Sequence, residues 1–260
     1  MLGSDVIVVT KLSYRDEYIL KELRDLGINV IVRESNYTTS FHISYGKTLD
    51  DRTLKVYSLA DSFTLDDLNC CVNSKYIYLG PLTTNDFNID LLREASKKSP
   101  VILDVQGFNR KVIGDEINYV DWDWKYEGLK YVTILKTDNK EAKLLTGLDD
   151  PKEAIDILSS WGPKEVVITS QEGVYILIKG VGKFFAPFIV DRVLGRVGRG
   201  DTCIAAYTHA RLRNWPIEFT VKFTAAATSL KLAYQGPLRN SEEDVIRYVE
   251  KYYGYVDIRI

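Results

Sequence analysis

The chain has 260 residues, of which 45% are hydrophobic and 27% are charged, and its formal net charge is −2. This length allows a sizeable core, built as one large domain or as a domain with an appendage. The nearly balanced charge argues against a protein that coats nucleic acid. Because no apolar run approaches the length of a membrane span and no cationic leader is present, we expect a cytoplasmic protein with no nucleic-acid or membrane partner.

Strands alternate with helices along the chain. Residues 5–10 and 28–33 are apolar, β-branched runs, and residues 14–26 between them carry leucine and isoleucine at helical spacing. Such a βαβ unit favours a parallel sheet covered by helices. The same patterns predict strands at 76–79, 101–105, 131–135 and 166–169, a hairpin of 174–178 with 183–187, and helices at 89–98, 140–145, 151–161, 201–213, 217–233 and 241–252.

One interval departs from this alternation. Residues 38–45 and 53–59 read as two strands joined by the charged turn 46–52, with no helix between them. We expect residues 38–59 to form a small β lid that stands off a core made of residues 1–37 and 60–260. An ordinary edge hairpin explains the same pattern equally well.

The most informative motif is Gly198-Arg199-Gly200-Asp201, which leads directly into an apolar helix. Glycines let backbone N–H groups turn toward an anion, and the helix N-terminus adds about half a positive charge. A carboxylate at this place can serve as a base in phosphoryl transfer. The alternative interpretation is a glycine-rich turn whose aspartate caps the helix.

Three further motifs occur around this one in a fixed order. Lys136-Thr137-Asp138-Asn139-Lys140-Glu141 is followed by Leu145-Thr146-Gly147, then comes the strand and loop of 166–175, and the alanine-rich helix of 225–236 follows the glycine motif. Together they resemble the ribokinase, or pfkB, family of carbohydrate kinases, in which a GAGD motif opens a helix. The resemblance implies an α/β, three-layer αβα ribokinase-like fold with a mostly parallel central sheet and a small β lid.

The resemblance also implies roles for the glycine motif. Asp201 would be the general base that removes the proton of the acceptor hydroxyl, and the backbone of Gly198, Arg199 and Gly200 would form the anion hole. Arg199 departs from the family's alanine. Its guanidinium could clamp phosphates, point at an acidic substrate, or form a salt bridge to a neighbouring helix.

The family resemblance further implies ATP and Mg²⁺ as cofactors. Asp138 and Glu141 would organise Mg²⁺, although an acid-rich helix start is the alternative interpretation. The remaining residues implied to line the nucleotide are small: Thr169, Gly173, Ala226, Ala227 and Gly236. For the alanines, core packing of their helix is the competing interpretation.

The acceptor side is implied by the segment that ends a predicted strand, where α/β sheets place ligands. Asp104, Gln106 and Arg110 lie in Asp-x-Gln-Gly-Phe-x-Arg, and Gly80 ends another strand. With the Gly236-Pro237-Leu238-Arg239 ending, this segment resembles the inositol-kinase-like branch of the family. The implied acceptor is therefore the hydroxyl of a sugar, a polyol such as inositol, or a sugar acid.

In the family, a strand with a sugar-binding Asp, part of the lid and a helix with Gly-Gly-x-x-x-Asn precede the segment that resembles residues 5–27. This sequence lacks them, and we favour a late start or a truncation over a genuinely shortened protein. The expected function is an ATP-dependent phosphotransferase, with a homodimer through the lid as one expected assembly. The alternatives are a non-catalytic nucleotide- or metabolite-binding protein and a nucleoside kinase of the same family.

Overall fold

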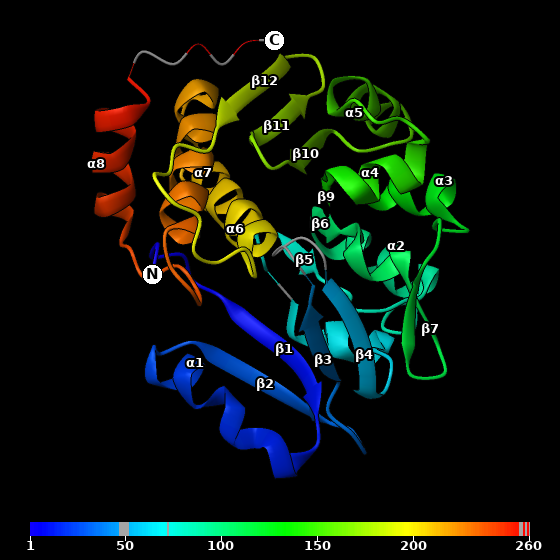
Figure 1. Cartoon of the computed structure of the whole chain (residues 1–260). Helices are drawn as coiled ribbons and strands as arrows, with labels where there is room; N and C mark the ends of the chain where they lie inside the picture. The colour runs from blue at the N-terminus through cyan, green and yellow to red at the C-terminus, as the bar shows by residue number, and fades with distance from the viewer. Residues whose placement is uncertain (47–51, 72, 255–256, 258, 260) are drawn as a thin grey trace.

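The computed structural model describes residues 1–46, 52–71, 73–254, 257 and 259. Its main sheet has six strands in the order β12-β11-β10-β9-β6-β5 (Figure 1). The four strands from β10 to β5 are parallel, and β11 is antiparallel to both of its neighbours, β10 and β12. The strands are β5 (Ile77–Leu79), β6 (Val101–Asp104), β9 (Ile134–Asp138), β10 (Glu165–Thr169), β11 (Gly173–Ile178) and β12 (Gly182–Pro187).

Helices cover both faces of the main sheet (Figure 1). One face packs against α2 (Ile89–Lys98), α4 (Asn139–Thr146) and α5 (Pro151–Ser160), and beside these lie the short α3 (Lys125–Gly128) and η4 (Leu129–Tyr131). The other face packs against α6 (Arg199–Leu212), α7 (Ile217–Leu232) and α8 (Glu242–Tyr252).

The strand residues alternate between these two cores. Val101 and Leu103 belong to the first core and Ile102 belongs to the second, and all three are fully buried. A strand that is buried on both faces needs a continuous apolar run, and the sequence of β6 provides one. The expected three-layer αβα arrangement with a mostly parallel sheet is therefore confirmed.

The N-terminal βαβ unit forms a sheet of its own. β1 (Ile7–Leu12) pairs in parallel with β2 (Asn29–Glu34), and η1 (Tyr14–Leu20) and α1 (Lys21–Asp25) connect them. The structure thus divides the predicted helix 14–26 into a 3₁₀ segment and a short α-helix. Among the described residues β1 pairs only with β2 and β5 only with β6, so each leaves one edge unpaired. Val6 and Ile7, 53% and 51% exposed, keep an apolar surface at that end of the molecule.

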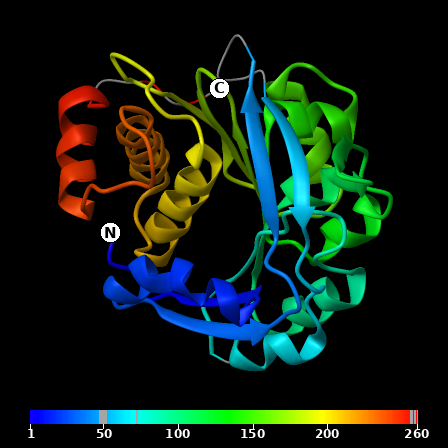
Figure 2. The ribbon, with the colours of Figure 1, turned by 60° about the horizontal axis from the view of Figure 1, so that its bottom comes forward.

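A third sheet contains the predicted lid strands and two more. β3 (Ser40–Tyr45) and β4 (Arg52–Ser58) correspond to the predicted pair, whereas residues 47–51 of the predicted turn lie outside the described residues. β4 then pairs with β8 (Glu116–Tyr119), which pairs with β7 (Arg110–Ile113). Figure 2 shows β3 and β4 standing side by side along the length of the molecule. The hairpin of β7 and β8, turned at Gly114 with φ +65°, was not predicted.

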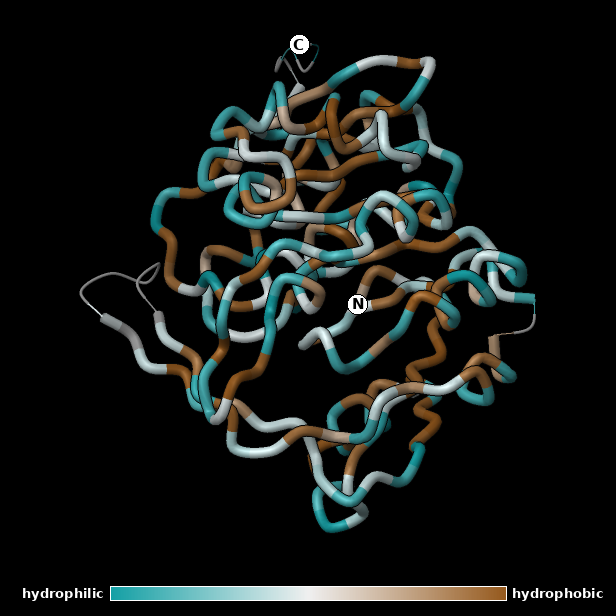
Figure 3. Tube along the Cα trace, turned by 90° about the vertical axis from the view of Figure 1, so that its right-hand side faces the viewer, coloured by the Kyte–Doolittle hydropathy of each residue, from teal (hydrophilic) through white to brown (hydrophobic). Residues whose placement is uncertain are grey.

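Hydrophobic segments run through the interior of the part that holds the main sheet, and hydrophilic segments follow the outer turns (Figure 3). In the part of the chain that the structure describes, no helix combines the length and the apolar character needed to cross a bilayer. Two short 3₁₀ segments complete the fold, η2 (Leu65–Cys71) before β5 and η3 (Val105–Asn109) between β6 and β7.

Gly107 lets the segment after β6 pack directly on the segment after β5. A Cβ at this position would lie 2.4 Å from the carbonyl carbon and oxygen of Pro81. Backbone atoms cannot rotate away as a flexible side chain can, so the contact excludes any larger residue. The absence of a side chain at Gly107 therefore holds these two connections together.

We predict that Gly107→Ala lowers the free energy of unfolding by about 1–3 kcal/mol, as overpacking against rigid neighbours does. Gly254→Ala is the matched control, because the nearest atom to its Cβ would be 3.5 Å away. Chemical denaturation of both variants measures the difference. Equal stability of the two variants would contradict the assigned contact.

Candidate active site

The carboxyl ends of the parallel strands hold a buried ion pair. Lys136 Nζ in β9 lies 2.9 Å from Asp104 Oδ2 at the end of β6, and both side chains are 5% exposed or less. Asp104 Oδ1 also accepts a hydrogen bond from the N–H of Gln106, at 3.1 Å. Burial alone lowers the pKa of Lys136, but the carboxylates of Asp104 and Glu141 outweigh this effect and raise it. Lys136 therefore stays positively charged inside the protein.

This lysine lies directly beneath the first turn of α6. A Cβ on Gly200 would lie 2.6 Å from Lys136 Nζ. The second glycine of the Gly198–Asp201 motif therefore leaves room for the lysine, and a side chain there would displace the ammonium group. The ammonium group and the helix N-terminus place positive charge at the same location.

The first turn of α6 leaves backbone donors available. Gly198 has φ +80°, a left-handed conformation that favours glycine, and it precedes the helix without a capping side chain. The N–H of Arg199 donates to the carbonyl of Arg196 at 3.1 Å. Among the described residues, the N–H groups of Gly198, Gly200 and Asp201 have no backbone acceptor. The anion hole was predicted to use the N–H groups of Gly198, Arg199 and Gly200. The N–H of Arg199 is instead used within the turn.

Asp201 lies in the first turn of α6 with an exposed side chain. No hydrogen bond or ion pair from a residue that the structure describes engages its carboxylate. Its Oδ2 lies 3.9 Å from the position of a Cβ on Gly198. An unpaired, accessible carboxylate beside free N–H donors can accept a proton from a bound hydroxyl group.

Asp138 and Glu141 form a reciprocal capping box at the start of α4. Asp138 Oδ1 accepts from the N–H of Glu141 at 2.9 Å, and Glu141 Oε2 accepts from the N–H of Asp138 at 2.8 Å. Burial, and then the carboxylate of Asp138, raises the pKa of Glu141 to about 7. In the described part of the chain no cluster of three or more metal-ligating side chains exists. Asp138 Oδ2 and Glu141 Oε1 are not used by the cap, and two carboxylates fit Mg²⁺, which keeps several waters.

The residues predicted to line a nucleotide have varied surroundings. Ala226 and Ala227 are fully buried in the core that α6 and α7 share. A Cβ on Gly173 would lie 2.2 Å from the carbonyl oxygen of Ala186, so this glycine serves the packing of β11 on β12. Thr169 is buried and donates to the carbonyl of Thr137 at 3.4 Å. Gly236 has φ +88° after α7, with open space around it.

The predicted acceptor residues lie between the strand ends and the lid. Asp104 carries the ion pair described above, and Gln106 belongs to η3. Arg110 is only 7% exposed and begins β7, and its Nε is buried without a hydrogen-bond partner. No ion pair joins Arg110 to a described residue. Such a buried cation favours an anionic ligand or the phosphoryl group itself.

The phenol of Tyr78, in β5, is influenced by the carboxylates of both Asp104 and Asp201. Loss of water around the phenol and the carboxylates of Asp104 and Asp201 together raise its pKa. A Cβ on Gly80 would lie 2.8 Å from the Tyr78 ring, so this predicted substrate residue leaves room for the tyrosine. Neither Tyr78 nor Lys136 was predicted as a site residue. For Lys136, its place in the motif that ends at Glu141 was the available signal.

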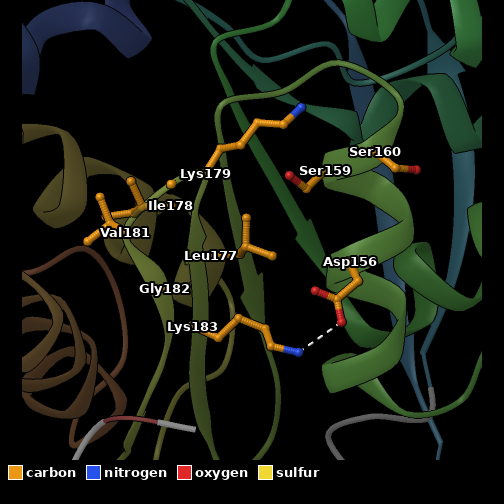
Figure 4. Close-up of a pocket in the computed structure, with 10 residues that line it drawn as sticks. Asp156, Ser159, Ser160, Leu177, Ile178, Lys179, Val181, Gly182 and Lys183 are labelled. Atoms are coloured by element: carbon orange, nitrogen blue, oxygen red, sulfur yellow. Dashed lines mark hydrogen bonds and ion pairs between the residues drawn. The ribbon is translucent and has the colours of Figure 1, made fainter.

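A separate pocket of about 430 Å³ lies between α5 and the turn of β11 and β12 (Figure 4). Lys183 and Asp156 form an ion pair of 2.8 Å at its edge. Glu165, the first residue of β10, pairs with Ile178 at this end. The pocket therefore lies at the amino ends of the parallel strands, opposite the ends where α/β sheets bind ligands.

Comparison with known proteins shows which family the chain resembles. The sequence pattern of the pfkB family of carbohydrate kinases matches residues 1–244. A pyrophosphate-dependent kinase in the ribokinase family, solved with sulfate, is 35% identical, with 94% of this chain and 86% of that chain covered and a TM-score of 0.86. A pyrophosphate-dependent myo-inositol-1 kinase, in a form converted to a myo-inositol-3 kinase, is 34% identical, with 96% and 86% covered and a TM-score of 0.85.

A ribokinase of Arabidopsis thaliana is 26% identical over 183 residues, which are 66% of this chain and 45% of the ribokinase. The match therefore spans less than half the length of that curated relative. The fold and the family pattern together define a ribokinase-like protein. The chain belongs to the pfkB family of carbohydrate kinases.

We predict that Lys136→Met destabilises the protein by about 3–5 kcal/mol, because it leaves the Asp104 carboxylate buried without its partner. The double variant Lys136→Met with Asp104→Leu should recover most of this stability, since an apolar pair replaces the charged one. Lys97→Met is the control, because the pair of Lys97 with Glu94 is exposed and surface pairs contribute about 1 kcal/mol or less. Urea denaturation measures the free energy of unfolding of each variant. If Lys136→Met loses no more stability than Lys97→Met, the importance of the buried pair is contradicted.

Proposed function

We propose that this chain transfers a phosphoryl group from a phosphoanhydride donor to a hydroxyl group of a polyol or sugar. The observation that carries the proposal is the exposed carboxylate of Asp201, which no described residue pairs, beside the N–H donors of Gly200 and Asp201, which have no acceptor among the described residues, close to the Lys136–Asp104 pair. This arrangement supplies a base and an anion site within one helix turn.

In the proposed reaction the acceptor oxygen forms a bond to the transferred phosphorus, and the bond from phosphorus to the leaving phosphate breaks. The acceptor proton moves to the Asp201 carboxylate. The N–H donors of the first turn of α6, with the Lys136 charge behind them, stabilise negative charge on the phosphoryl oxygens. Asp138 and Glu141 would hold Mg²⁺, which neutralises phosphate charge when it is bound.

Two donors are consistent with this site. The motifs predict ATP, and a ribokinase of Arabidopsis thaliana with the same fold was solved with ribose and ATP bound. Inorganic pyrophosphate is supported by the two solved structures of 34–35% identity, both described as pyrophosphate-dependent. We therefore place inorganic pyrophosphate first and ATP second.

For the acceptor we propose a cyclic polyol of the inositol class. The similarity to a myo-inositol kinase and the Asp-x-Gln-Gly-Phe-x-Arg segment support it. Asp104, Gln106 and Arg110 would face the acceptor or the transferred group, and the sheet of β3, β4, β8 and β7 would cover it. Excluding water in this way favours transfer to the acceptor over hydrolysis.

The first test measures transfer by the wild-type chain from pyrophosphate and from ATP with Mg²⁺, to myo-inositol, ribose, gluconate and cytidine. We expect Asp201→Asn to lower turnover by about 10²–10⁴-fold, the usual contribution of a general base. Donor binding should persist, because the backbone donors remain. Asp191→Asn, which changes another exposed aspartate, is the control. Full turnover by Asp201→Asn would overturn the assigned base, and donor binding without transfer by the wild type would favour a non-catalytic binding protein.

A second test concerns Arg110. We expect Arg110→Met to lower kcat/KM by about 10–100-fold, as loss of a charge-assisted contact does. Its stability should stay equal or rise, because the substitution removes a buried Nε that has no partner. Lys111→Met, the exposed next residue, is the control. An unchanged kcat/KM would contradict the role of Arg110.

A further inference from the structure

Lys231 is a fully buried lysine in the last turn of α7. Its Nζ donates to the carbonyl of Gly195 at 2.9 Å and, more weakly, to that of Tyr234 at 3.5 Å. No ion pair joins it to any residue that the structure describes. Lys136 and Lys125 differ in this respect, because each has a carboxylate partner.

A buried ammonium group without a carboxylate is unfavourable, and carbonyl oxygens compensate only part of the lost hydration. Burial accordingly lowers the pKa of Lys231, and no carboxylate counteracts it. An anion close to this ammonium group would compensate for the rest of the lost hydration.

Lys231 lies beside the start of α6. A Cβ on Gly198 would lie 3.6 Å from Lys231 Cε and 3.9 Å from Asp201 Oδ2. The stem of Lys231 and the proposed base thus lie beside one glycine, and the Lys231 Nζ, which is more than 4 Å from that position, donates to the carbonyls of Gly195 and Tyr234. Positive charge from α7 and from the N-terminus of α6 meets at this position.

The surrounding loop fixes the lysine in place. The N–H groups of Leu194 and Gly195 donate to the carbonyl of Leu232, at 2.8 and 3.4 Å. A Cβ on Gly195 would lie 2.6 Å from the carbonyl oxygen of Tyr234. The segment before α6 is therefore attached to the end of α7, and the Lys231 stem has little freedom to turn away.

From this geometry we infer that Lys231 binds the phosphate groups of the donor at the first turn of α6. The inference rests on the proposed function, and it adds a side-chain ligand that none of the sequence motifs indicates. Its chemistry suits inorganic pyrophosphate and the phosphate chain of ATP alike. A lysine at this place offers one of its N–H donors to the anion while the others hold the loop.

The test measures binding of inorganic pyrophosphate, and separately of ATP with Mg²⁺, by isothermal titration calorimetry. We expect Lys231→Met to raise the Kd of the donor by about 10–100-fold and Lys231→Arg to restore part of the affinity. Lys222→Met is the matched control on the same helix, because Lys222 is only half-buried and its Nζ donates weakly, at 3.5 Å, to the carbonyl of Gly254. In the kinetic assay the KM of the donor should rise while the KM of the acceptor stays the same.

Thermal unfolding first establishes that each variant is folded, and Lys231→Arg serves if Lys231→Met is not. A folded variant without the lysine that binds both donors as tightly as wild type would overturn the inference alone. A wild type that binds pyrophosphate but transfers phosphate to no acceptor would overturn the proposed function. The inference about Lys231 would then still be decided by the Kd values.

Discussion

The buried ion pair of Lys136 and Asp104 connects the central sheet to the glycine motif. The pair lies where β6 and β9 end, and its ammonium group reaches Gly200 so closely that a side chain there would displace it. The favourable interaction of the two charges depends on exact placement, because either charge alone would be buried without compensation. This requirement fixes the first turn of α6 relative to the strand ends. The free N–H donors and Asp201 are positioned as a consequence.

The electrostatic pattern around that turn explains how one small region can bind an anion and also keep a base available. The Lys136 ammonium group lies close to Gly200, and the stem of Lys231 lies close to Gly198. The helix N-terminus adds partial positive charge. Asp104 balances Lys136 inside the protein, whereas Asp201 remains exposed and unpaired among the described residues. A phosphate group would balance the remaining positive charge, and the exposed carboxylate would then face the incoming hydroxyl group.

Much of the fold could be predicted from local patterns. The apolar run of β6 and the spacing of α2 specify elements whose partners are other regular elements, and the structure has both near the predicted bounds. The hairpin of β7 and β8 was missed because its strands are only four residues long and give a short pattern, although Gly114 was a turn signal. At the site, the motif around Asp201 was informative because its chemistry is local. Lys231 could not be found in this way: its role depends on α7 packing against a loop 36 residues earlier, and a buried lysine in an apolar helix has no local signature.

The most direct test of this account is a crystal structure of the chain with inorganic pyrophosphate and a polyol, collected with Asp201→Asn to prevent turnover. The account predicts a diphosphate bound to the N–H groups of Gly200 and residue 201 and to Lys231 Nζ. It also predicts a polyol hydroxyl group within hydrogen-bond distance of the residue 201 side chain. Diphosphate bound elsewhere, for example in the pocket between α5 and β11, with the first turn of α6 left empty, would contradict the account.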